Sequence, residues 1–143
     1  MTAASFDGLD LISARSLAVN RVTEMSDMVT ELAGERHVAA VWMHSGTDYM
    51  GIGPWANGRL LRAVSMSSAD GIIENVGEPL SFEAPFWEGR RPVIHLSNYP
   101  LPFHPLGMGS EALRELFLAS SWRGGSTQTV STSKICRYPR LRR

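Results

Sequence analysis

The fold is decided by the stretch at residues 49–67, which reads YMGIGPWANGRLLRAVSMS. Asn57-Gly58 at its centre is the strongest short signal for a β-hairpin, because both central residues of a type I′ turn need a positive φ. A two-residue turn also sets the register of the two strands that flank it. The pairs predicted from it are Ala56–Arg59, Trp55–Leu60, Ile52–Ala63 and Met50–Ser65.

Both faces of this predicted hairpin are apolar. In that register one face carries Tyr49, Trp55, Leu60, Val64 and Met66, and the other carries Met50, Ile52, Leu61 and Ala63. Such a hairpin belongs inside a sheet that is covered on at least part of each side. Gly51 and Gly53 interrupt the first strand and mark either a bulge or the close approach of another segment.

Further strands and two helices are predicted on either side of the hairpin. Residues 38–43 form a short apolar run typical of a buried strand, and residues 72–76 form a second strand. An amphipathic pattern over 24–33 predicts a helix with Thr23 or Ser26 as its N-cap. Ser110 is the predicted cap of another helix over 110–120. We expect Val41 and Trp55 to lie in the core.

The segment from Gly77 to Met108 contains six prolines and five aromatic residues. The prolines exclude long helices and central strands, and the aromatic residues are too many for a disordered linker. We predict an ordered loop that packs its aromatic rings over the sheet, with one helical turn near 85–89. The predicted fold class is α+β: an antiparallel sheet with a central hairpin, two helices and this long proline- and aromatic-rich loop.

Composition bounds the class of protein. The chain has 143 residues, of which 43% are hydrophobic and 20% charged, and it contains one cysteine, Cys136. No apolar run is long enough to cross a bilayer, and residues 1–10 do not read as a secretory signal. A single cysteine excludes a disulfide framework, so we expect a protein of the reducing cytoplasm with no membrane partner.

The charge is distributed unevenly along the chain. Residues 1–121 carry 8 basic and 14 acidic side chains, whereas residues 122–143 carry 6 basic side chains and no acidic one. We predict one globular domain over 1–121 and a basic disordered tail over 122–143, with an exposed Cys136 thiol. A nucleic-acid or acidic-membrane arm is one interpretation of the tail; a degenerate or frame-altered C-terminus is the one we favour, and nucleic acid is disfavoured as a partner.

A candidate acid–base pair lies in the turn after the first buried strand. His44 and Asp48 are four residues apart, with Ser45 and Thr47 as hydroxyl partners, and such a pair serves hydrolytic chemistry. The alternative is that these residue types satisfy the backbone of a turn.

Glu74 and His104 are weaker candidate binding residues. Glu74 lies near Glu78 and Asp70, as carboxylates for acid–base work do, but acids at strand ends and in turns look the same. His104 lies in the rigid turn PFHPL at 102–106, where it either presents a ring nitrogen to a ligand or packs within the loop.

Common cofactor motifs are missing from the sequence. It contains no GxGxxG, GxxxxGK[ST] or GxSxG motif, and its histidines lack the spacing of metal ligands. We therefore expect neither a metal nor a cofactor.

An ordered series of motifs resembles a family of uncharacterised bacterial proteins, a domain of unknown function, over about residues 6–118. The motifs are WANGRL at 55–60, SMS at 65–67, GIIENVGEPL at 71–80, FEAPFWEG at 82–89, PLPFHPL at 100–106 and EALRELF at 111–117. The resemblance implies no activity, cofactor or catalytic residue. Members usually open with an additional strand and helix, so it implies that the edge of the strand at 38–43 is bare here. A bare apolar edge favours self-association.

Two functions remain open from the sequence. The first is a non-catalytic binding or regulatory domain, which the missing catalytic motifs and the aromatic loop favour. The second is a hydrolase-like enzyme that uses His44 and Asp48.

Overall fold

The computed structural model describes residues 2–6, 9–13, 19–93, 98–118 and 127–133. The helices are α1 (Ser26–Ala33), α2 (Ala84–Trp87) and α3 (Pro105–Leu113). Short 3-10 turns, Val22–Met25 and Ser81–Glu83, precede α1 and α2, and a π-helical turn, Arg114–Leu118, follows α3. No helix within these ranges is long and apolar enough to cross a bilayer.

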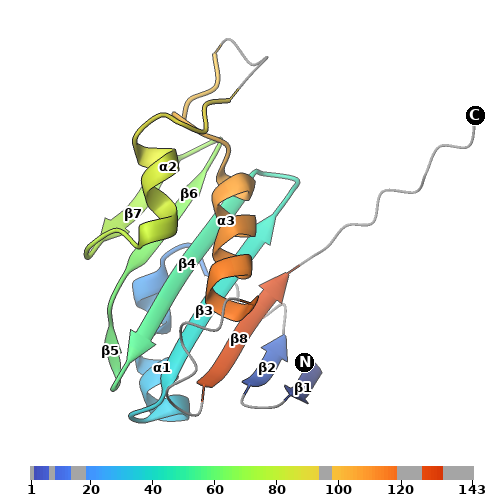
Figure 1. Ribbon diagram of the computed structural model, residues 1–143, viewed down its shortest axis with the longest axis vertical. Coiled ribbons are helices and arrows are strands. Elements are labelled where there is room, and N and C mark those ends of the chain that lie inside the picture. Colours follow the sequence, from blue (N-terminus) through green and yellow to red (C-terminus); the bar gives the residue numbers. More distant parts are fainter. Residues whose placement is uncertain (1, 7–8, 14–18, 94–97, 119–126, 134–143) are drawn as a thin grey trace, which may run out of the picture.

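One sheet of eight strands forms the middle of the molecule (Figure 1). The strands are β1 (Thr2–Phe6), β2 (Leu9–Ser13), β3 (His37–His44), β4 (Tyr49–Ala56), β5 (Arg59–Leu60), β6 (Ala63–Ser67), β7 (Gly71–Val76) and β8 (Thr127–Ser133). Their order is β1-β2-β8-β3-β4-β6-β7, with β5 also paired to β4. Strands β3 to β7 are antiparallel, which confirms the predicted α+β class.

Strand β8 corrects two predictions. It lies between β2 and β3 and runs parallel to both, so the predicted disorder of the tail over 122–143 is wrong for residues 127–133. It also pairs along β3 from His37 to Met43, and the edge that we expected to be bare is therefore covered. Residues 126–133 include six Ser or Thr residues and offer little apolar surface to bury. The prediction failed because a strand between two others is stabilised by its backbone ladders as well. Cys136 lies outside the described residues.

The central turn forms as predicted, but the predicted register of the two strands holds only next to the turn. Asn57 and Gly58 have φ values of 51° and 69°, and Trp55 pairs with Leu60. Further along, Ile52 pairs with Val64 rather than with Ala63. One residue has been inserted into the second strand, and every later side chain of that strand is on the opposite face from the one predicted.

Pro54 explains this bulge. Its carbonyl accepts a hydrogen bond from the Leu61 backbone N–H at 2.9 Å, so its edge faces the second strand of the hairpin. Proline has no N–H to return to that strand, and the ladder has to break there. The extra residue is Arg62, which turns into the protein and is 1% exposed.

The sheet is covered on both faces, and two cores result. Helix α1 covers one face, and α2 and α3 cover the other (Figure 1). Trp55, at 0% exposure, lies in the core beneath α1, and Val41, at 1%, lies in the core beneath α2 and α3. Both were predicted to be core residues, and both are.

Gly51 and Gly53 mark close approaches, one of the two alternatives predicted for them. A Cβ atom on Gly51 would overlap the Trp42 indole, and one on Gly53 would overlap Val22 and the Trp55 ring. Glycine at these two positions lets two large aromatic side chains lie flat against the backbone of β4.

Candidate functional site

An open pocket of about 250 Å³ lies where the long loop meets α3. It is lined by Phe86 of α2, Arg91 and Pro92 of the loop, and His104, Gly107 and Glu111 at the beginning of α3. Of the four residues nominated from the sequence, His104 is the one at this pocket.

His104 is here because it caps α3. Its backbone is extended, with φ −80° and ψ 122°, and its Nδ1 atom accepts a hydrogen bond from the Leu106 N–H at 3.3 Å. Pro105 follows at the first helical position, where a missing N–H costs nothing. The predicted cap, Ser110, lies inside the helix and donates to the Leu106 carbonyl. The helix begins earlier than predicted because a proline at this position starts a helix rather than excluding one.

Asp48 and His104, which the sequence analysis treated separately, lie together. The His104 Nε2 atom is 3.6 Å from Asp48 Oδ2, and the Tyr99 hydroxyl donates to the same oxygen at 3.3 Å. The Tyr99 and His104 rings stack, with centroids 5.5 Å apart and planes 14° apart. These contacts fasten the proline-rich loop to the turn between β3 and β4.

The Tyr99 contacts predict a measurable titration. Burial and the neighbouring Asp48 carboxylate raise the pKa of Tyr99 to about 12. The folded protein therefore holds this phenolic proton more tightly than the unfolded chain, whose pKa is 10.0. Stability from this source is complete below pH 10 and is lost as the pH rises from about 10 to about 12. Phenolate absorbance should show a component near pH 12 that Tyr99→Phe removes. A wild-type minus variant difference centred near pH 10 would contradict the assignment.

His44 and Asp48 are not paired with each other. The His44 ring is exposed at the end of β3, and its Nδ1 atom lies 3.1 Å from the Thr47 hydroxyl. Asp48 has a positive φ of 46° and turns its carboxylate toward Tyr99 and His104 instead. The turn itself is closed by the backbone, since the Thr47 N–H donates to the His44 carbonyl at 3.3 Å.

Glu74 acts as an anchor for the polypeptide that leads into α1. Its side chain is buried in β7 and accepts hydrogen bonds, each 2.5 Å long, from the Val22 N–H and the Thr23 hydroxyl. The Glu74 carboxylate of β7 thus accepts from a backbone N–H at the beginning of the 3-10 turn that precedes α1. Neither Thr23 nor Ser26 forms the predicted side-chain cap. Both oxygens of the Glu74 carboxylate therefore have hydrogen-bond donors against them.

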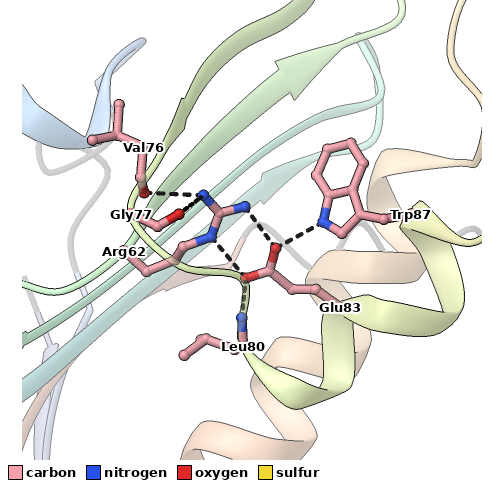
Figure 2. Close-up of polar contacts among 6 residues, drawn as sticks. All are labelled: Arg62, Val76, Gly77, Leu80, Glu83 and Trp87. Atoms are coloured by element: carbon pink, nitrogen blue, oxygen red, sulfur yellow. Dashed lines mark hydrogen bonds and ion pairs between the residues drawn. The ribbon is translucent and has the colours of Figure 1, made fainter.

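The sequence analysis missed a buried ion pair between Arg62 and Glu83 (Figure 2). Arg62 donates from Nε and Nη2 to the two Glu83 carboxylate oxygens, at 3.0 and 2.7 Å. Its third nitrogen, Nη1, donates to the carbonyls of Val76 and Gly77. Both side chains are fully buried, so the pair is a rigid connection between the sheet and the loop.

Glu83 also fixes the helix that forms one side of the pocket. Its carboxylate accepts hydrogen bonds from the Leu80 N–H at 3.0 Å and from the Trp87 indole at 2.8 Å (Figure 2). Trp87 and Phe86 both pack edge-on against Phe103, with ring centroids 5.0 and 5.3 Å away. The position of Phe86 at the pocket therefore depends on the buried pair. In the sequence, the feature that could have predicted this buried pair is Pro54, because a proline within the hairpin causes the bulge that turns Arg62 inward.

The acidic groups around the pocket already have partners. Arg114 donates to both carboxylate oxygens of Glu111, at 2.6 and 3.4 Å. This hydrogen bonding, aided by the nearby charge of Arg91, holds the pKa of Glu111 below its usual value. Within the part of the chain that the structure describes, Arg91 makes no hydrogen bond or ion pair of its own. No group of three metal-binding side chains converges among these residues.

The fold and the pocket together define an α+β protein whose sheet is covered on both faces. The chain belongs to a family of unknown function (DUF6928), whose model matches residues 1–129. The predicted resemblance is confirmed, and the match extends beyond Leu118 into β8. Comparison with curated proteins and with solved structures found no match.

Proposed function

We propose that this protein is a non-catalytic binding or regulatory domain of the cytoplasm, and that its ligand occupies the pocket between Phe86, Arg91 and the beginning of α3. The observation that carries the proposal is an open pocket with an apolar wall and a cation, Arg91, that has no hydrogen-bond or ion-pair partner among the described residues. The buried Arg62–Glu83 pair holds the adjoining helix α2 rigidly. The single cysteine supports the proposed compartment.

The contacts of His104 support binding rather than catalysis. A histidine that acts as a general base uses one nitrogen to contact an orienting carboxylate and leaves the other free for substrate. In this protein Nε2 faces Asp48, while Nδ1 accepts the hydrogen bond that caps α3. Neither nitrogen is free to take a proton from a molecule in the pocket.

The hydrolase alternative needs His44 and Asp48 to share a proton path. The contacts of the two side chains lead in different directions, to Thr47 for His44 and to Tyr99 and His104 for Asp48. No specific contact favours this second function.

Binding can be tested with a fragment library that contains acids, amines and neutral molecules, followed by two-dimensional amide NMR. We expect fragments to shift the amide signals of Arg91, Gly107 and Glu111 and to be recovered unchanged. Gly107→Leu should abolish these shifts, because the new side chain projects toward Phe86, which lies 3.6 Å from a Cβ at this position.

Ser110→Leu provides the matched control, since it adds the same side chain to an exposed position of the same helix. It should leave binding intact. Fragments that bind elsewhere, or that bind Gly107→Leu as well as the wild type, would overturn the proposed site.

A further inference from the structure

We propose that the pocket selects a carboxylate attached to a compact apolar group, with the Arg91 guanidinium holding the carboxylate and Phe86 and Pro92 contacting the apolar part. This inference rests on the proposed function and adds the chemical class of the ligand. Three properties of the pocket carry it: its uncommitted charge, its lack of free backbone donors and its size.

The charged side chain at the pocket that has no partner among the described residues is a cation, Arg91. The Glu111 carboxylate is held on both oxygens by Arg114, and the Asp48 carboxylate faces Tyr99 and His104. Each acid thus has a donor or cation against it already. Arg91 lines the pocket without a hydrogen-bond or ion-pair partner among the described residues. A ligand gains most by presenting an anionic group to this guanidinium.

The backbone at the beginning of α3 offers no cradle for a phosphate. Pro105 has no N–H, the Leu106 N–H donates to His104 Nδ1, and the Gly107 N–H donates to the His104 carbonyl. Phosphate sites at helix ends depend on several such groups being free. A guanidinium is a planar fork that matches two oxygens of either a carboxylate or a phosphate, but the remaining oxygens of a phosphate would find no free backbone donor at the beginning of α3. The donor set therefore favours a carboxylate over a phosphate.

The rest of the pocket is small and apolar. Phe86 is 6% exposed and is held edge-on against Phe103, so it offers a fixed surface. Gly107 has no side chain to cover it. A volume of about 250 Å³ lies below the range of roughly 300–1,000 Å³ found for drug-sized ligands. One aromatic ring or branched alkyl group fits, supplied either by a free organic acid or by the last residue of a peptide.

The test uses two pairs of probes that differ only in the charge of the terminal group. The first pair is N-acetylphenylalanine and N-acetylphenylalaninamide; the second is the peptide Gly-Gly-Gly-Phe with a free and with an amidated C-terminus. Binding is followed by amide NMR in wild type, Arg91→Gln and Arg90→Gln. Arg90 is the matched control, because it is exposed, adjacent, and paired with Glu88 outside the pocket.

We expect the acids to bind about tenfold or more tightly than the amides, and Arg91→Gln to remove that preference while Arg90→Gln retains it. Tighter binding of N-acetylphenylalanine than of the peptide assigns the site to free acids, and the reverse assigns it to peptide C-termini. Acids and amides that bind the pocket equally would overturn the carboxylate assignment and leave the proposed function standing. A pocket that binds no probe here and no fragment in the library would overturn both.

Discussion

Glu83→Gln should lower the free energy of unfolding by about 3–5 kcal/mol, because it leaves the buried Arg62 guanidinium without a counter-charge. Glutamine keeps the size of the side chain but replaces one carboxylate oxygen with an NH2 group, so the change removes the charge and also two of the four hydrogen bonds that the Glu83 oxygens accept. Both members of the pair are fully buried, and water cannot replace the lost carboxylate. For a domain with a total stability of about 5–15 kcal/mol, this is a large fraction. Urea denaturation of both proteins measures it.

The matched control is Glu88→Gln. Glu88 pairs with Arg90 at 2.6 Å, but their side chains are 58% and 62% exposed, and a pair of this kind contributes about 0–1 kcal/mol. The two variants make the same chemical change five positions apart, at Glu83 on a fully buried carboxylate that accepts four hydrogen bonds and at Glu88 on an exposed one paired with Arg90. A loss below about 1 kcal/mol for Glu83→Gln would show that the pair is not sealed from water.

A double variant separates charge burial from hydrogen bonding. Arg62→Met with Glu83→Leu removes both charges, and replacing a whole buried pair by apolar residues is often neutral. Here it also leaves the Val76 and Gly77 carbonyls and the Leu80 N–H without their partners. We expect the double variant to be less stable than the wild type and more stable than the sum of the single losses predicts.

The consequences for the pocket follow from the same contacts. Glu83 holds the Trp87 indole, and Trp87 and Phe86 share Phe103 as their packing partner. Loss of the Glu83 charge therefore loosens the apolar wall of the pocket as well as the fold.

The local features of the fold could be predicted from the sequence, and the long-range ones could not. The Asn57-Gly58 turn needs two positive φ values, a requirement that the two residues themselves meet. The helical turn at α2 was likewise visible in its own residues. The register beyond Leu60 is also encoded locally, because Pro54 lacks the N–H that a continuous ladder needs.

The candidate site was less predictable for a physical reason. Asp48 and Tyr99 are 51 positions apart, and their contact depends on how the proline-rich loop returns to the sheet. His104 could be nominated as a residue held in a rigid turn. Its partner, Asp48, could not be predicted, because the sequence around Asp48 indicates a contact with the nearby His44 as strongly as with any distant side chain. Glu74 shows the converse, since its carboxylate looked available for chemistry and instead satisfies the backbone at Val22.

Gly51 was predicted to mark a close approach or a bulge, and the packing explains why only glycine fits. It lies directly opposite Trp42 in the β3–β4 ladder. The Trp42 ring lies across its backbone, is 3% exposed, and donates from Nε1 to the Val19 carbonyl at 3.0 Å. A methyl group at position 51 would occupy the space of the indole. The ring then has to move and give up its hydrogen bond.

Gly51→Ala should therefore destabilise the protein by about 1–3 kcal/mol, the usual range for overpacking a dense core. Gly107→Ala is the control: it lies in α3, its Cβ would be 3.6 Å from Phe86, and alanine favours a helix by up to about 1 kcal/mol over glycine. Thermal denaturation should place the two variants on opposite sides of the wild type. Trp42→Phe in the Gly51→Ala background removes the second ring, so the combined loss should be smaller than the sum of the two single losses. Additive losses would mean that the methyl group and the indole do not compete for the same space.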